Sequence, residues 1–447
     1  MSSAEPTPAA DSSRERSGLV GWWQARRSGR TVVIAWLVTR LLMLVVMTIL
    51  DTTNKTRPVT GDVLYYQRKI VGLFEVGLPG TMMEYPTPVV WILTLPYGAG
   101  FGSQVGYVVA FVILMLALDA AFTYALWRSA GRRHDLAVDF WIAFVFLVGP
   151  LSYGRFDIIP AVLAGGASLA ARTRPWIAGA LIGLGAAIKL WPALLIPALM
   201  ADKQRRKPTA IGFVVVGFGL ALVSLIAGGM TRLFSPLTWQ SDRGLQIESV
   251  WASPLMLVRM VDPQGWLVEI SKYQAFEIFG PGVGVWQTAS NIATVAGLVT
   301  IVLLWVRAFR VRGGVSPVAV ALVVLATVAM MIITNKTLSP QYLLWLGGPV
   351  AALLLLRTQA ATPGLRRWIV RLAVAALVLA GLTQLVYPLL YDSYLNLTGP
   401  VGLVVATLVT TVRNLGLLGY TVATVFLAWR TTSSSPATPS PAADAGR

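Results

Sequence analysis

Long apolar stretches separated by short basic tracts dominate this chain. A membrane-spanning helix needs about 20 mainly apolar residues, and the first such stretch lacks the small-residue cleavage site of a signal peptide. The pattern therefore predicts a chain that crosses a membrane about ten times. The expected crossings run roughly over 31–50, 104–127, 209–228, 286–306, 316–334, 340–356, 369–389 and 400–429, with shorter ones at 137–150 and 156–171.

Basic residues cluster beside these stretches. The net charge of +17 would also suit a nucleic-acid-binding protein, but the preference of Lys and Arg for cytoplasmic loops explains the clustering better. We therefore expect both termini in the cytoplasm and no nucleic-acid partner. The tracts are Arg26, Arg27 and Arg30; Arg128, Arg132 and Arg133; Arg172 and Arg174; Lys203, Arg205, Arg206 and Lys207; Arg307, Arg310 and Arg312; and Arg366 and Arg367.

Two apolar segments do not fit as full crossings. If 86–100 crossed, the arginines after Trp127 would face outward, so we interpret Tyr85–Gly100 as a re-entrant or surface helix on the outer side. Trp176–Met200 has basic tracts at both ends and a Lys189-Leu190-Trp191-Pro192 break in its middle. It is predicted to be a hairpin of two half-helices, and such breaks are tolerated only inside protein or beside a wet cavity.

The predicted fold is an all-α polytopic membrane domain over 31–430, with about 10 to 12 transmembrane helices and re-entrant or juxtamembrane helices on the outer side. The larger outer segments are 51–103 and 229–285. Residues 1–30 and 431–447 are expected to be cytoplasmic tails, largely disordered. A hydrophobic content of 56% and a charged content of 12% leave no room for a soluble class.

Several chemistries are excluded by composition. The chain has no cysteine and one histidine, His134, so cysteine and histidine metal clusters are impossible. It also lacks a phosphate-cradling glycine-rich loop and a hydrolase nucleophile elbow. We therefore predict no metal, no cofactor and no use of a cytosolic nucleotide donor; His134 is interpreted as a bystander in a basic loop.

The first outer segment carries the most suggestive polar residues. Asp62 follows the first span closely and could deprotonate a bound hydroxyl while nearby cations hold a phosphate. The alternative is a solvated loop with a helix-capping aspartate. Glu84 and Tyr85 open the short outer helix, where a rigid corner is the simpler role. Candidate substrate contacts in this segment are Tyr65, Tyr66, Arg68, Glu84 and Tyr85.

Charges inside or between spans form a second set of candidates. Lys189, in the hairpin break, is assigned a functional role, because an unpaired charge at membrane depth is costly. Asp119 is interpreted as a structural polar contact. Arg155 and Asp157 lie outside between two crossings, either as a local ion pair or as phosphate and substrate ligands.

The remaining candidates come from two further outer turns. Arg243 could bind a phosphate and Glu248 a sugar hydroxyl, with ordinary loop solvation as the alternative. The turn between 316–334 and 340–356 carries Lys336, Gln341 and Tyr342, more polar groups than a short connection needs. Lys336 could instead snorkel to the interface.

Four of these motifs, in this order, resemble the GT-C superfamily of integral-membrane glycosyltransferases. The likeness is to the polyprenyl-phosphate-mannose-dependent mannosyltransferases of family 87 and to the first mannosyltransferase of GPI-anchor synthesis. It rests on Asp62 with its tyrosines, Tyr85-Pro86-Thr87-Pro88, Ile188-Lys189-Leu190-Trp191-Pro192, and Asn335-Lys336 followed by Ser339-Pro340-Gln341-Tyr342-Leu343-Leu344-Trp345.

The resemblance implies a GT-C-type fold with Asp62 as the general base. The chain has a single aspartate where the GPI enzyme has paired acids, and it lacks histidines found in some family 87 members after the last motif. The implied reaction moves a hexose, mannose, from a polyprenyl-phosphate donor to a cell-envelope glycolipid or lipoglycan, with inversion. The donor phosphate would contact Lys189, Lys336, Arg243 and Arg155, and the acceptor or sugar would contact Asp157, Glu248, Gln341 and Tyr342 besides the tyrosine-rich first segment.

Other functions remain open at this point. A transporter or flippase of a lipid-linked sugar would also need a cationic break and a lipid groove, and a scaffold subunit would use the outer segments only to recruit partners. Arabinose could replace mannose within the enzyme class. On each reading the chain is a multi-pass protein of the plasma (inner) membrane, and the enzyme's active site is expected on the extracytoplasmic side.

Overall fold

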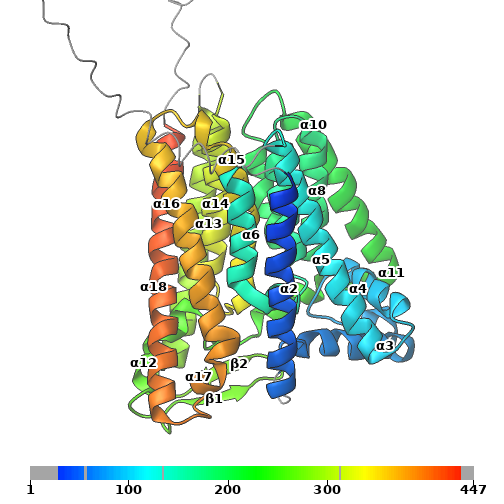
Figure 1. Ribbon diagram of the computed structural model, residues 1–447, viewed down its shortest axis with the longest axis vertical. Coiled ribbons are helices and arrows are strands. Elements are labelled where there is room, and N and C mark those ends of the chain that lie inside the picture. The colour runs from blue at the N-terminus through cyan, green and yellow to red at the C-terminus, as the bar shows by residue number, and fades with distance from the viewer. Residues whose placement is uncertain (1–28, 55–57, 133–134, 312–313, 434–447) are drawn as a thin grey trace, which may run out of the picture.

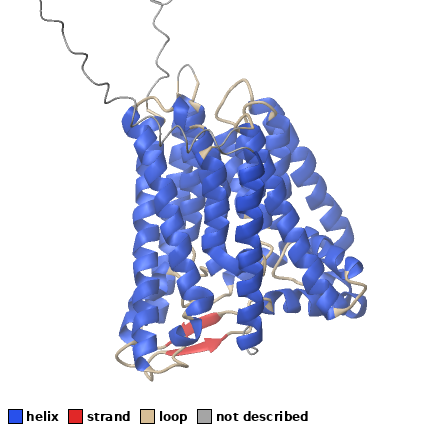
Figure 2. Ribbon diagram, viewed as in Figure 1, coloured by secondary structure: helices blue, strands red, loops and turns tan. Residues whose placement is uncertain are grey.

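The protein folds into one bundle of helices. The computed structural model describes residues 29–54, 58–132, 135–311 and 314–433, and nearly all of these are helical or in short turns (Figures 1 and 2). The helices of the first half are α2 Gly29–Thr53, α3 Gly61–Gly80, α4 Thr87–Ala99, α5 Gln104–Ser129, α6 Leu136–Val148, α7 Ile158–Ala170, α8 Pro175–Ile188, α9 Ile196–Leu199, α10 Arg206–Phe213 and α11 Gly219–Ser241.

The second half adds a small sheet to the bundle. Strands β1 and β2 pair antiparallel, with Leu267 opposite Phe279 and Ile270 opposite Phe276. The sequence did not predict this hairpin, because each strand is only four residues long. The elements of this half are α12 Ser253–Arg259, β1 Leu267–Ile270, β2 Phe276–Phe279, α13 Val283–Arg310, α14 Pro317–Thr334, α15 Leu344–Leu355, α16 Pro363–Gln384, α17 Tyr391–Tyr394 and α18 Pro400–Thr431.

The predicted polytopic, helical class is confirmed. Within the described ranges, seven helical stretches are long and apolar enough to cross a membrane. The shorter α6 and α15 run through the same bundle (Figure 1), and α7 packs against α15 and α8. The 3-10 turns η1 (Gly149–Ser152) and η5 (Pro340–Leu343) lengthen α6 and α15. The short predicted crossings 137–150 and 156–171 match α6 with η1 and α7.

The bundle has two unlike ends. At one end, which we call the basic end, α2 starts and α5 and α18 finish. Arginines of different segments are tied to the backbone there: Arg205 Nε donates to the Arg172 carbonyl (2.9 Å) and Arg307 Nε to the Trp429 carbonyl (3.2 Å). Five elements gather at the opposite end, which we call the loop end: α3, α4, α12, α17 and the β1–β2 hairpin (Figure 1). The basic tracts that lie in the described residues therefore collect at one end, as predicted. His134 and most of the two predicted tails lie outside the described residues.

Two predicted outer segments contain more helix than expected. Residues 61–80 form α3 instead of a loop, so Asp62 lies in the first turn of a helix. The crossing expected to end near 228 continues as α11 to Ser241, with a change of direction at Gly229 (φ 77°). Beyond this kink Arg232 is buried and donates to the carbonyls of Tyr85 (2.8 Å) and Met82 (3.1 Å), so the last part of α11 is tied to the start of α4.

The predicted hairpin at Lys189 is present, with unequal arms. Helix α8 ends at Ile188, and Lys189 is extended (φ −139°, ψ 135°). The returning arm consists of the 3-10 turn η2 (Trp191–Leu195) and the four-residue α9. Pro192 and Pro197 lack the N–H that a regular helix needs, which explains why the second arm is not a full half-helix.

A buried polar cluster anchors the first span. Asp119 accepts from Arg40 Nε (2.8 Å), Trp36 Nε1 (2.9 Å), Trp141 Nε1 (2.7 Å) and the Tyr153 hydroxyl (2.8 Å). Asp119 and Arg40 are both almost fully buried. A charge with this many partners fits the predicted structural role of Asp119.

Candidate active site

Asp62 is placed by a contact between the end of α2 and the residues just before α3. Asp51, near the end of α2, accepts from the Val59 amide (2.5 Å) and from the Thr60 hydroxyl (2.7 Å). This contact fixes the start of α3, where Asp62 occupies the first turn. The helix dipole stabilises a carboxylate there. The Asp62 side chain is 43% exposed, so a second molecule can reach it.

Arg155 lies directly beside this carboxylate. Its Nε is 2.5 Å from Asp62 Oδ2, and its side chain is only 9% exposed. The rest of the guanidinium is held by the carbonyls of Gly154 (2.8 Å) and Val59 (3.1 Å) and by the Tyr387 hydroxyl (3.4 Å). Burial, the largest single influence, lowers the pKa of Arg155, but Asp62 together with Tyr387 and Tyr66 raises it further, so the pKa lies above its ordinary value.

Lys189 is paired with Asp157, which lies two positions after Arg155. Its Nζ is 2.5 Å from Asp157 Oδ1, which also accepts from Trp345 Nε1 at 2.9 Å. Three rings surround the ammonium, those of Phe156, Tyr342 and Trp345, with centroids at 5.0–5.3 Å. Lys189 is therefore a cation held in a largely aromatic, poorly hydrated environment.

Aromatic stacking joins the two motifs that carry these groups. Trp345 stacks on Tyr342 (centroids 4.1 Å apart) and on Trp191 (4.9 Å). Trp191 belongs to the hairpin break, Tyr342 to the turn η5 before α15, and Trp345 to the first turn of α15. Two segments about 150 positions apart in the sequence thus form one surface around Lys189.

The turn 154–157 lies between Asp62 and Lys189. The alternative of a local Arg155–Asp157 ion pair is wrong, because Arg155 pairs with Asp62 and Asp157 with Lys189. Between them, Phe156 packs against the rings of Tyr66 (5.5 Å) and Tyr85 (5.0 Å). The predicted base and the predicted hairpin amine therefore lie at the same end of the bundle, linked through one short turn.

The other predicted residues of α3 and α4 border this site. Tyr65 donates to Glu84 Oε1 at 2.7 Å, and Tyr66 is buried. Arg68 is exposed on α3. The Tyr65–Glu84 hydrogen bond links α3 to the residues just before α4. These residues therefore hold in place the side of the site that carries Asp62.

Lys336 and Arg243 belong to a separate group beside the β hairpin. Lys336 Nζ donates to the Ser241 carbonyl at 2.8 Å, and the Gly244 amide donates to Glu277 Oε1 at 3.1 Å. Burial lowers the pKa of Lys336, with Arg243 acting in the same direction and Glu277 opposing it. Among the described residues no hydrogen bond or ion pair links this group to Lys189 or Arg155, so the four predicted phosphate ligands divide into two sets.

Glu248 is enclosed by the protein. It is fully buried, and its Oε2 is 3.1 Å from Arg413 Nη1 of α18. Asn414 adds a bond to Ser253 Oγ (2.8 Å). The predicted contact of Glu248 with a sugar hydroxyl does not fit this geometry, because an accessible carboxylate is needed; the arrangement instead fastens the outer segment to α18. Gln341, the last predicted contact, is half-buried in η5.

This enclosure makes stability dependent on pH. Burial raises the pKa of Glu248 from 4.5 to about 7, although Arg413 acts to lower it. Between about pH 4.5 and 7 the folded protein holds a proton that the unfolded chain has released, so this contribution to stability is present at low pH and lost as the pH rises through that window. We expect the unfolding temperature of the detergent-solubilised protein to fall between pH 5 and 8, and Glu248→Gln to flatten that fall. An identical pH profile for the variant would contradict this assignment.

Several residues of the site were not predicted. Tyr387 and Asp51 belong to no recognisable motif, because a single Tyr or Asp is common at the end of a membrane span. Arg413 and Asn414 could have been found, since two adjacent polar residues inside an apolar span signal a buried partner. Among the described residues, no group of three His, Cys, Asp or Glu side chains lies close enough to hold a metal ion.

Comparison with known proteins identifies the family. The sequence profile of glycosyltransferase family 87 matches residues 85–334, more than half of the chain. The chain belongs to glycosyltransferase family 87. It is therefore a membrane glycosyltransferase, which confirms the resemblance stated from the motifs. The family 87 match includes Arg155, Asp157 and Lys189, whereas Asp62 and Lys336 lie outside its bounds.

Structural comparison adds one distant likeness. The chain superposes on ArnT from Cupriavidus metallidurans, solved bound to undecaprenyl phosphate, with a TM-score of 0.43 and 13% sequence identity. The match covers 93% of this family 87 chain and 78% of ArnT. No curated protein sequence matches the chain.

Proposed function

We propose that this chain transfers mannose from a polyprenyl-phosphate donor to a cell-envelope glycolipid or lipoglycan acceptor, with inversion at the anomeric carbon. The observation that supports this most directly is the partly exposed Asp62 carboxylate, 2.5 Å from the buried Arg155 guanidinium. A base and a phosphate-binding cation are the two groups that such a transfer needs. Membership of family 87 supports the reaction type.

In the proposed reaction Asp62 acts as the general base. Its carboxylate accepts the proton of an acceptor hydroxyl while that oxygen attacks the anomeric carbon of the donor. The bond between that carbon and the phosphate oxygen breaks, and polyprenyl phosphate leaves with the bonding electrons. Attack from the side opposite the leaving group inverts the anomeric configuration. A positioned base contributes about 10²–10⁴-fold to such a step.

Arg155 has a second part in this proposal. A carboxylate oxygen in contact with a guanidinium is less available to a substrate hydroxyl, because that oxygen already has a partner. Arg155 Nε is at ion-pair distance from Asp62 but lacks hydrogen-bond geometry to any described group. A donor phosphate would therefore compete well for Arg155, and its arrival would free Asp62 to accept the proton. Donor would then bind before the acceptor is deprotonated.

Lys189 supplies the other cation of the donor subsite. A phosphodiester carries one negative charge, and the departing phosphate gains a second. A cation in an aromatic, water-poor environment interacts more strongly with such charge than one in water. Asp157 and Trp345 orient Lys189 towards that role.

We place the loop end of the bundle outside the cytoplasm. The basic tracts at the other end support this orientation. The cysteine-free chain allows a direct check with single cysteines at two exposed positions, Gln264→Cys at the loop end and Ala361→Cys at the basic end. A membrane-impermeant maleimide added to intact cells is expected to label only Gln264→Cys. Labelling of Ala361→Cys alone would reverse the orientation.

A donor panel tests the proposed substrate. Purified protein is incubated with an envelope lipid extract and radiolabelled polyprenyl-phosphate-mannose, polyprenyl-phosphate-arabinose or GDP-mannose. We expect labelled glycolipid from the first donor alone. Labelled glycolipid from the arabinose donor would change the proposed sugar to arabinose and leave the proposed mechanism as it is. Labelled glycolipid from GDP-mannose alone would overturn the proposal of a lipid donor.

A further inference from the structure

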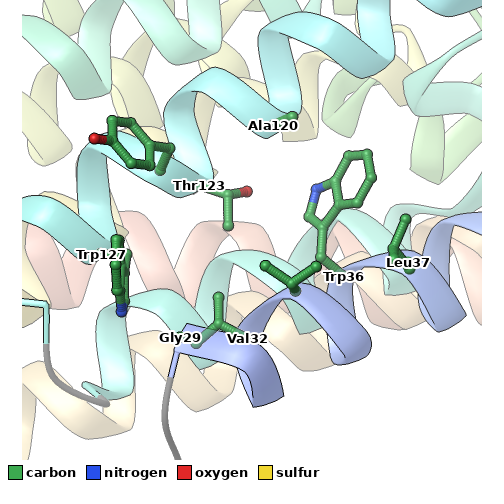
Figure 3. A pocket seen from close by; sticks show the side chains of 9 residues that line it. Gly29, Val32, Trp36, Leu37, Ala120, Thr123 and Trp127 are labelled. Carbon is green, nitrogen blue, oxygen red and sulfur yellow. The ribbon is translucent and has the colours of Figure 1, made fainter.

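A cleft lies between α2 and α5 at the basic end of the bundle. It encloses about 440 Å³ and is lined almost wholly by apolar side chains, among them Val33, Leu37, Trp36 and Trp127 (Figure 3). The only hydroxyl groups in its wall are those of Thr123 and Tyr124. An apolar cleft between two spans is suited to a hydrocarbon chain.

The walls of the cleft are fixed by the fold. Trp36 is held by its hydrogen bond to Asp119 (2.9 Å). Trp127 lies against the start of α2, where a side chain at Gly29 would come within 2.8 Å of the indole ring. Val33 and Leu37 are 55% and 53% exposed on the face of α2 that membrane lipid would cover. The cleft is thus preformed and open towards lipid.

Three arginines lie beside the end of the cleft nearest the basic end, although none of them lines it. Trp127, which lines the cleft, has a buried Nε1 without a hydrogen-bond partner among the described residues. The Arg132 guanidinium lies over the Trp127 ring at 5.9 Å. Arg30 and Arg128 are exposed within one or two positions of Gly29 and Trp127.

Two acids among the described residues near these arginines are already paired with other arginines. The nearest acid along the chain after these arginines, Asp135, is paired with Arg357 at 2.8 Å. Asp119, deeper in the bundle, is paired with Arg40. An apolar cleft beside three arginines has the chemistry that recognises an anionic lipid headgroup with its acyl chain.

We propose that this cleft binds an anionic phospholipid of the leaflet at the basic end. One acyl chain lies between α2 and α5, and the phosphate lies beside Arg128 and Arg132. This site is separate from sugar transfer. The 22 residues of α2 between Gly29 and Asp51 rise about 33 Å, so the lipid does not reach Asp62.

Site-specific fluorescence quenching tests the proposal. A single cysteine at Val33, carrying an environment-sensitive fluorophore, is reconstituted in bilayers that contain brominated phosphatidylglycerol or brominated phosphatidylcholine. We expect brominated phosphatidylglycerol to quench half of the fluorescence at a mole fraction at least fivefold lower than brominated phosphatidylcholine needs. The matched control is a single cysteine at Leu408, which is 47% exposed on α18 and is expected to show equal quenching by both lipids.

Variants of Arg128 and Arg132, beside the basic end of the cleft, identify the source of the preference for phosphatidylglycerol. Arg128→Gln and Arg132→Gln are each expected to reduce it about fivefold, as loss of one cation near a charged lipid surface implies, and Arg132→Lys is expected to keep it. Equal quenching at Val33 by both lipids, or an unchanged preference in Arg128→Gln/Arg132→Gln, would overturn the proposal. Displacement of phosphatidylglycerol by equimolar undecaprenyl phosphate would overturn it in favour of a polyprenyl lipid.

Discussion

Replacing Asp62 by Asn is expected to lower transfer from the polyprenyl phosphosugar by about 10²–10⁴-fold, the usual contribution of a general base. Asn keeps the size of the side chain but cannot accept the proton. Because Asp62 is 43% exposed and Arg155 keeps its bonds to two carbonyls and to Tyr387, the fold should tolerate the change. The measurement is kcat with saturating donor and acceptor extract, together with the thermal unfolding temperature.

Glu75→Gln provides the matched control for this variant. Glu75 lies on the same helix, α3, and is exposed. It should retain wild-type transfer, because it has no place in the site. Near wild-type transfer by Asp62→Asn, with the unfolding temperature unchanged, would remove Asp62 from the mechanism.

Removing Lys189 is expected to affect both stability and transfer. In Lys189→Met the Asp157 carboxylate, which is 1% exposed, would keep only the Trp345 N–H as a partner. Breaking a buried ion pair in this way costs about 3–5 kcal/mol. We therefore expect a clear fall in the unfolding temperature and loss of transfer in the detergent-solubilised protein.

The double variant Asp157→Asn/Lys189→Met separates these two effects. Without the carboxylate there is no uncompensated charge, so much of the stability should return. Transfer should not return, because the donor phosphate still lacks its second cation. Full transfer by a stable double variant would show that the pair is only structural.

The sequence allowed the spans and the unusual hairpin to be predicted for clear physical reasons. Apolar runs of spanning length have few alternatives in a membrane, and the basic tracts fixed the parity of the crossings. Lys189 followed by Trp191 and Pro192 marked the break, because a charge and a proline do not continue a buried helix.

The pairing within the site could not be predicted in the same way. Asp62 and Arg155 are 93 positions apart, and nothing in either local pattern indicates the other. The helical state of 61–80 was missed because Gly77 and Pro79 near its end are typical of a loop. Arg232 was overlooked, although its burial fastens the end of α11 to the corner before α4.

Arg155 was predicted as one of several phosphate ligands, and the structure gives it a more particular position. It is the cation adjacent to the proposed base, whereas Lys336 and Arg243 form a group beside the β hairpin. Arg243 belongs to the same outer segment as Glu248, which Arg413 fastens to α18, and the Gln246 amide of that segment donates to the Lys336 carbonyl at 3.1 Å.

The most direct test of the account is a single-turnover reaction of purified wild-type protein, in excess over radiolabelled polyprenyl-phosphate-mannose, with an envelope lipid extract. We predict one labelled glycolipid for each polyprenyl phosphate released, with inverted anomeric configuration. Donor that remains intact, or donor that crosses a liposome bilayer without any change of its glycosidic bond, would contradict the account.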